Sequence, residues 1–262
     1  MDPTLRLAAA ACALAVVAVA ATAQTSGPQG KLLLTSGVSS IDGAAGGGLT
    51  PWALTASHAT TGQVGASAFV TRLRTQDYAL SVQGVALGFG DRLELSLARQ
   101  DFDTGDRIAP LGFPGLRLQQ TIVGAKLRLA GDAVLDSDRW HPQLALGVQH
   151  KRLDVVAPFA AVLQSLGARD HGTDVYLSAT KLFLAQGVLA NLTLRATRAN
   201  QNGLLGFGGT ARSHDRLQPE ASLALLLRKD LAIGAEFRAK PDNLNPSVFG
   251  DGLREDDWRD VF

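Results

Sequence analysis

The sequence predicts an all-β protein, an antiparallel up-and-down β-barrel of about ten to twelve strands of the outer-membrane type. Three observations predict this class: apolar and polar residues alternate along most of the chain, glycine-rich turn signals separate the alternating runs, and the amino terminus has the pattern of an export signal. The same alternation fits a soluble β-sandwich or soluble barrel, and that class stays open as the alternative.

The amino-terminal residues have the three parts of a secretory signal peptide. Arg6 supplies a positive charge, Leu7–Ala21 is an unbroken apolar run, and Ala21-Thr22-Ala23 fits the small-x-small cleavage pattern. The run is shorter than the roughly 20 apolar residues that a spanning helix requires, so we expect cleavage rather than anchoring. We therefore predict a signal peptide at 1–23 and a single β-barrel domain at 24–262.

The composition excludes several classes of function. The chain carries 25 basic and 24 acidic residues, and this balance argues against a nucleic-acid partner. Its single Cys, at position 12, excludes a disulfide framework and a thiolate metal site. We expect no cofactor, no bound metal and no enzymatic activity. The expected partners are outer-membrane lipid and the outer-membrane assembly machinery.

Strict alternation of apolar and polar residues identifies the strands. Along 92–99 the leucines at 93, 95 and 97 share one side, whereas Glu94 and Ser96 share the other. The runs of this kind, about eleven in all, lie at 52–59, 64–74, 77–88, 92–101, 116–130, 142–153, 173–186, 188–199, 217–228, 230–239 and 257–262.

The connections between runs alternate in length. Short turn signals occur at 90–91, 130–132, 186–187 and 229–230, and longer links occur at 102–115, 154–172 and 200–216. Short turns at one end and long loops at the other are typical of an outer-membrane barrel. Within the second long link, the apolar stretch 153–166 has room for a short helix or a lid.

A membrane barrel and a soluble sandwich differ in the direction that the polar side of each strand faces. In a membrane barrel the polar side lines the lumen, whereas in a sandwich it faces water. The candidate lumen-lining residues are Glu94, Lys126, Arg128, Lys151, Arg195, Glu236 and Arg238. Trp52, Trp140 and Trp258 each begin a predicted strand, where an interfacial aromatic girdle would lie.

Three local motifs match catalytic or binding patterns only in part. Gly43–Gly48 is glycine-rich but has no following Gly-Lys-Ser/Thr, so we expect a turn rather than a phosphate loop. The aspartates at 101, 103 and 106 lack the spacing of a calcium loop. Ser178-Ala-Thr-Lys181 has no Ser-Asp-Asn or Lys-Thr-Gly partner. We therefore predict no catalytic residues.

The chain resembles an uncharacterised family of exported proteobacterial proteins, a domain of unknown function. The resemblance rests on the ordered segments 46–54 (GGGLTPWAL), 91–96 (DRLELS), 98–100 (ARQ), 111–115 (LGFPG), 123–128 (VGAKLR), 131–133 (GDA), 140–143 (WHPQ) and 257–262 (DWRDVF). It implies an outer-membrane or periplasm-facing β-barrel-like protein without an established activity, and it supplies no catalytic residues.

The end of the chain departs from the pattern of that family, whose members continue with further strands after this stretch. A terminal Phe, here Phe262, is typical of outer-membrane proteins, but Asp256 and Asp260 fall where that signal has apolar residues. Bacterial barrels have even strand numbers, and about eleven runs are one short of twelve. Two interpretations therefore remain: truncation before a further strand, or a natural end.

Three classes of function follow from these observations. The first is passive permeation of small solutes, porin-like, or a structural role in the outer membrane, with polar residues lining the channel. The second is a soluble periplasmic β-protein that binds an apolar ligand. An envelope hydrolase, with Ser and His brought together from different strands, is a third and weaker candidate.

Overall fold

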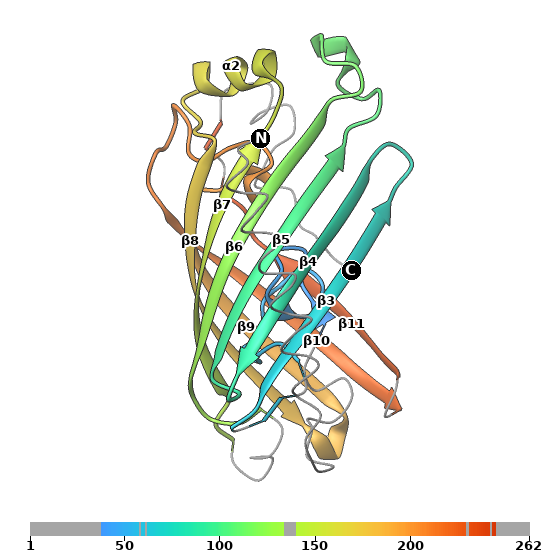
Figure 1. Cartoon of the computed structure of the whole chain (residues 1–262), viewed down its shortest axis with the longest axis vertical. Helices are drawn as coiled ribbons and strands as arrows, with labels where there is room; N and C mark the ends of the chain where they lie inside the picture. The colour runs from blue at the N-terminus through green and yellow to red at the C-terminus, as the bar shows by residue number, and fades with distance from the viewer. Residues whose placement is uncertain are drawn as a thin grey trace.

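The computed structural model describes residues 38–57, 59–60, 62–133, 140–228, 231–241 and 243–244. These residues form one nine-stranded antiparallel sheet, curled into a half-barrel, and a separate two-stranded hairpin (Figure 1). The prediction of an all-β antiparallel protein is confirmed. The expected signal peptide at 1–23 and the expected strand at 257–262, with Trp258, lie outside the described residues.

The strands of the large sheet follow one another in chain order, so each pairs with its neighbour in the sequence. They are β3 (Val64–Arg74), β4 (Ala79–Phe89), β5 (Leu93–Asp103), β6 (Arg117–Ala130), β7 (Gln143–Asp154), β8 (His171–Phe183), β9 (Val188–Thr197), β10 (Arg216–Arg228) and β11 (Leu231–Arg238). β3 and β11 are the two edges, and in the described part of the chain they do not pair with each other. The up-and-down order is thus present, in an open half-barrel.

The two faces of the sheet differ in burial. In β7, for example, Gln149 and Lys151 on the concave face are 0% and 1% exposed, whereas Leu146 and Val148 on the convex face are 44% and 40% exposed. Successive side chains of a strand point to opposite faces, so this alternation follows directly from the sequence pattern. The polar side of the alternation is therefore the buried one.

Helical turns and loops lie at the ends of the strands. The one α-helix in the described ranges, α2 (Ala157–Ser165), connects β7 to β8 at the end drawn uppermost in Figure 1. Phe159 and Leu163 lie on one helix face and pack into an apolar cluster with Leu116, Leu153 and other residues. Of the two possibilities that the sequence left open for 153–166, a short helix or a lid, the structure has the short helix. Three 3₁₀ turns, η1 (Ala109–Leu111), η2 (Leu184–Gln186) and η3 (Asn200–Gly203), complete the connections.

No helix in these described ranges has the length and apolar character that crossing a membrane would require.

The sequence prediction of a strand at 52–59 is wrong. The described residues of this run have no strand in the large sheet and belong to an irregular, buried segment. Its backbone polar groups bond to side chains of the sheet instead of to a neighbouring strand: the Ala53 amide donates to Thr180 Oγ1 at 2.7 Å. The glycine-rich stretch 43–48, expected to be a turn, includes β2 (Ala45–Gly46), which pairs with β1 (Val38–Ser39).

Candidate functional site: the filled concave face

Residues 38–57, which we call the plug segment, lie within the curl of the large sheet, where the blue trace appears in Figure 1. Residues 40–46 and 49–56 are all buried. The segment has little regular structure of its own, so its buried backbone donors and acceptors need partners elsewhere. Side chains on the concave face of the sheet supply many of them.

Strands β8 and β9 bind the plug backbone through hydroxyl groups. Ser178 and Thr193 both donate to the carbonyl oxygen of Pro51, at 3.1 Å and 2.9 Å. Thr180 accepts from the Ala53 amide, and Gln143 of β7 donates to the Ala53 carbonyl at 2.7 Å. Each of these four side chains is no more than 2% exposed, so their hydrogen bonds to the plug replace bonds to water.

A buried ion pair on β5 and β6 holds a second part of the plug. Lys126 Nζ lies 3.1 Å from Glu94 Oε2, and both side chains are 1% exposed. Glu94 accepts from the amides of Ala45 and Ala56, and Lys126 donates to the Ala45 carbonyl at 2.9 Å. The pair is therefore neutral as a unit, and each partner also bonds to plug backbone.

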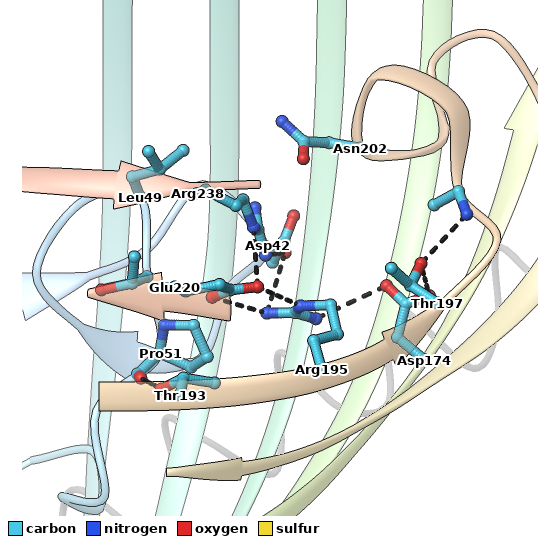
Figure 2. A network of polar contacts seen from close by, with 12 residues as sticks. Asp42, Leu49, Pro51, Asp174, Thr193, Arg195, Thr197, Asn202, Glu220 and Arg238 are labelled. Atoms are coloured by element: carbon cyan, nitrogen blue, oxygen red, sulfur yellow. Dashed lines mark hydrogen bonds and ion pairs between the residues drawn. The ribbon is translucent and has the colours of Figure 1, made fainter. Parts of the chain in front are cut away.

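Asp42 of the plug is the centre of a larger charged network, and Figure 2 shows Asp42 with Arg195, Arg238, Asp174 and Glu220. Its Oδ2 accepts from Lys151 Nζ at 3.2 Å and from Arg238 Nη2 at 2.5 Å. Arg195 Nη2 lies 3.8 Å from the same oxygen, and Gln100 Nε2 lies 3.5 Å from Oδ1. The three basic residues stand on β7, β9 and β11, so the curl of the sheet is what brings them to one carboxylate.

Two further carboxylates complete this network. Asp174 of β8 pairs with Lys151 at 3.1 Å and with Arg195 at 3.4 Å. Glu220 of β10 pairs with Arg195 and, at 3.0 Å, with Arg238. Three basic and three acidic side chains thus balance in a region where an unpaired charge is costly.

The basic residues around Asp42 stabilise its ionised form. Burial alone would raise the pKa of the Asp42 carboxyl, because a low-dielectric interior disfavours the ionised form. The guanidinium of Arg238, the ammonium of Lys151 and the guanidinium of Arg195 together outweigh burial and hold this pKa well below its usual range. Asp42 is therefore ionised at neutral pH and contributes the charge that balances the network.

Two further candidate lumen residues, besides the Glu94–Lys126 pair, lie away from the Asp42 network. Glu236 of β11 accepts from the Leu49 amide at 2.6 Å and from Thr50 Oγ1 at 2.7 Å, so it binds the plug. Arg128, at the end of β6, pairs with Asp91 and with Asp132 and is 19% exposed. The structure thus brings six of the seven candidates onto plug contacts or the Asp42 network and leaves Arg128 at the rim.

The tryptophans occupy different environments. Trp52 belongs to the plug, is 7% exposed, and donates from Nε1 to Ser222 Oγ at 3.0 Å. This position differs from the surface girdle expected from the sequence, because the segment that carries Trp52 lies inside the sheet and not along its edge. Trp140 is 81% exposed and stacks on His141 close to the start of β7.

The sequence analysis did not identify the three acidic residues of the network, Asp42, Asp174 and Glu220. It also did not predict that the plug segment fills the concave face. Asp174 and Glu220 alternate with other polar residues in the runs 173–186 and 217–228, and this signal was sufficient to find them. Asp42 lies outside any alternating run, so no periodic signal marked it. The filling of the concave face by the plug depends on long-range folding and has no local signature.

Two cavities near the site have charged residues in their linings. A cavity of about 10 Å³, room for about one water molecule, adjoins the network and is lined by Lys151, Arg195, Arg238, Lys240 and others. A second, of about 320 Å³, lies beside Asp91, Arg92 and Arg128 at the rim. Among the residues that the structure describes, no three His, Cys, Asp or Glu side chains group closely enough to hold a metal ion. The chemistry that the arrangement supports is recognition of a carboxylate and of peptide backbone.

Fold and site together define a class: an antiparallel β-sheet protein whose polar concave face is filled by its own chain. A comparison with family models matches residues 35–262 to the protein of unknown function DUF3034, and the chain belongs to that family. The expected membership of an uncharacterised family is thereby confirmed. Comparisons with curated proteins and with solved structures gave no match.

Proposed function

We propose that this protein is an outer-membrane β-barrel with a structural role in the envelope, its interior filled by the plug segment. The observation that carries the proposal is a row of leucines across the convex face. Leu93, Leu127, Leu146, Leu177 and Leu194 stand opposite one another on five consecutive strands. Each is between 36% and 46% exposed.

The adjoining row on the same face has the same character. It contains Leu95, Ala125, Val148, Val175 and Ala196, again in direct register. Contiguous exposed apolar surface of this extent is unfavourable in water and marks a surface that contacts lipid or another protein. Apolar residues outside and ionised residues inside are the arrangement of a membrane barrel, whereas a soluble sandwich has the opposite one.

The plug favours a structural role over an open pore. Its backbone is bonded to strands from β5 to β11, and solute passage through the concave side requires its displacement. The alternative of a soluble protein with an apolar ligand calls for an apolar cavity. The two cavities described above both include charged side chains in their linings.

Fractionation of the native envelope, followed by electrophoresis in cold and heated detergent, tests the membrane location. We expect recovery in the outer-membrane fraction and a band that shifts on heating. Release into the periplasmic fraction without detergent would contradict the proposal.

A matched pair of substitutions tests the lipid contact itself. Leu146 lies in the middle of the apolar row, whereas Leu111 lies in η1 beyond the strands, and the two are 44% and 47% exposed. In lipid, an outward Arg at the centre of the band costs about 2–4 kcal/mol, so Leu146→Arg should fold poorly in bilayers while Leu111→Arg folds normally. If both variants fold equally well, the convex face does not contact lipid.

A further inference from the structure

Three basic side chains converge on a single carboxylate inside the sheet. Lys151, Arg195 and Arg238 come from β7, β9 and β11 and all approach Oδ2 of Asp42 within 3.8 Å. Gln100 of β5 approaches Oδ1 from another side (Figure 2 shows the two arginines around Asp42). All four side chains that surround Asp42 are buried, and each of them projects from a strand of the large sheet.

The sheet alone has an uncompensated positive charge at this point. Without Asp42, the three basic residues face only Asp174 and Glu220, which leaves one positive charge in a buried site. Arg238 Nη1 is also buried and has no hydrogen-bond partner within the described residues. This nitrogen belongs to a residue that lines the small cavity, together with Lys151 and Arg195 of the same network. Charge and hydrogen-bonding capacity thus both call for an anion with several acceptor oxygens.

Asp42 fills this site from the tip of a tight turn. The Ser40 amide donates to the Ala44 carbonyl, and the Gly43 amide donates to the Ser40 carbonyl, so the turn closes around residue 42. The carboxylate is therefore presented to the sheet as a ligand would be, by a segment that is not part of the sheet.

We propose that Lys151, Arg195, Arg238 and Gln100 form a binding site for a small carboxylate anion, which Asp42 occupies in this structure. The site accepts a free carboxylate when the side chain of Asp42 is removed. Binding involves ion pairing and hydrogen bonds with no covalent step, because every partner is a donor and the anion supplies only acceptors. The inference concerns the interior of the sheet and does not depend on a membrane location.

Chemical rescue of Asp42→Ala tests the site. This variant removes a carboxylate group from its place among the four donors, and formate is a free carboxylate of the same size. We expect the melting temperature of Asp42→Ala to be lowered, and to rise in formate along a saturating curve by about 3 °C or more. Sodium chloride at the same ionic strength provides the comparison for general salt effects.

Two matched variants control the experiment. Asp42→Asn removes the charge but fills the same space, so formate has no place to bind and should give no saturating rise. Asp101→Ala removes a carboxylate that is paired with Arg117, whose side chain is 59% exposed, and should not respond specifically to formate. Wild-type protein should not respond either, because Asp42 already occupies the site.

The result that overturns the proposal is equal behaviour of formate and chloride on Asp42→Ala, or an equal formate response in Asp42→Asn. If Asp42→Ala does not fold in buffer or detergent alone, the yield of folded protein on refolding becomes the readout. A yield in formate no higher than in chloride then overturns the proposal. None of these outcomes bears on the outer-membrane location, which fractionation tests separately.

Discussion

Glu94 of β5 and Lys126 of β6 stand directly opposite each other in the sheet, and their charged groups pair at 3.1 Å with 1% of each side chain exposed. Both side chains also bond to the backbone of the plug segment. The two residues therefore link the sheet to the plug, and the loss of either leaves both a buried charge and a plug amide or carbonyl without its partner.

Lys126→Ala should destabilise the protein by about 3–5 kcal/mol, because the buried side chain of Glu94 then loses the ion pair that compensates its burial. The control is Arg117→Ala, which breaks the exposed pair with Asp101 and should cost less than about 1 kcal/mol. Denaturant unfolding of both variants in the same detergent measures the difference. Equal losses would mean that Glu94 gains water or a new partner when Lys126 is absent.

The Asp42 network should make stability depend on pH in the acid range. The folded-state pKa of Asp42 is lowered, so its contribution is complete above the unfolded value of about 3.9 and is lost as pH falls toward the folded value. We expect wild type to be more stable than Asp42→Asn at pH 7, and the difference to shrink below about pH 4. Unfolding free energies between pH 7 and pH 3 measure this difference.

The comparison of wild type with Asp42→Asn at each pH is needed because other carboxylates lie in the same network. Asp174 and Glu220 face Lys151, Arg195 and Arg238 in both proteins, and their titration largely cancels when Asp42→Asn is compared with wild type. A difference that is constant from pH 7 to pH 3 would contradict an ionised Asp42 at the centre of the network.

How far the sequence predicts this structure depends on whether the signal is local. Strict alternation in 92–101 and 142–153 predicted β5 and β7, because alternate residues of a strand face opposite sides of the sheet. The same pattern marked Glu94, Lys126, Lys151 and others as one polar face. It did not say that this face is filled, since the plug bonds through backbone atoms that every residue possesses.

Trp52 illustrates the limit of local reasoning. An aromatic residue at the start of an apolar run is compatible both with a surface girdle and with an interior segment. Long-range contacts place it inside: its hydrogen bond to Ser222, 170 residues away in the sequence, and its packing against Leu182 and Leu189. Asp42 was missed for the same reason, because its three basic partners lie between 109 and 196 residues away.

Gly147 of β7 should not tolerate a side chain. Tyr176 stands opposite on β8, and a Cβ on Gly147 would lie 2.1 Å from Cζ of its ring. The ring has little freedom to move, because it is 2% exposed and Arg195 stacks on it at 4.9 Å from the ring centre. Gly147→Ala should therefore lose about 1–3 kcal/mol through overpacking.

A glycine outside the sheet, without such a neighbour, serves for comparison. Gly112, in the loop after η1, has nothing within 4 Å of an added Cβ, although its φ of +88° adds backbone strain to any substitution. Gly147→Ala with Tyr176→Phe distinguishes the ring from its hydroxyl group, since Cζ remains in both. Thermal unfolding measures the losses, and a stable Gly147→Ala would mean that the ring can move aside.

The plug should keep the wild-type protein closed to ions in planar bilayers. If the sheet forms a lipid-embedded barrel, deletion of residues 38–57 removes the segment bonded across β5 to β11 and should produce stepwise conductance. Asp42→Asn keeps the plug backbone contacts of Thr180, Ser178 and Glu236 and should conduct much less than the deletion.

The net charge that remains in the network after deletion of residues 38–57 predicts the ion selectivity of the deletion variant. Lys151, Arg195 and Arg238 outnumber Asp174 and Glu220 by one where Asp42 stood, so the passage should prefer anions near that level. Reversal potentials in a salt gradient measure this preference, and heat-modifiability verifies that the deletion variant is folded. If the wild type conducts as well as the folded deletion variant, the plug does not obstruct the passage. If the deletion variant prefers cations, the Asp42 network does not line the passage.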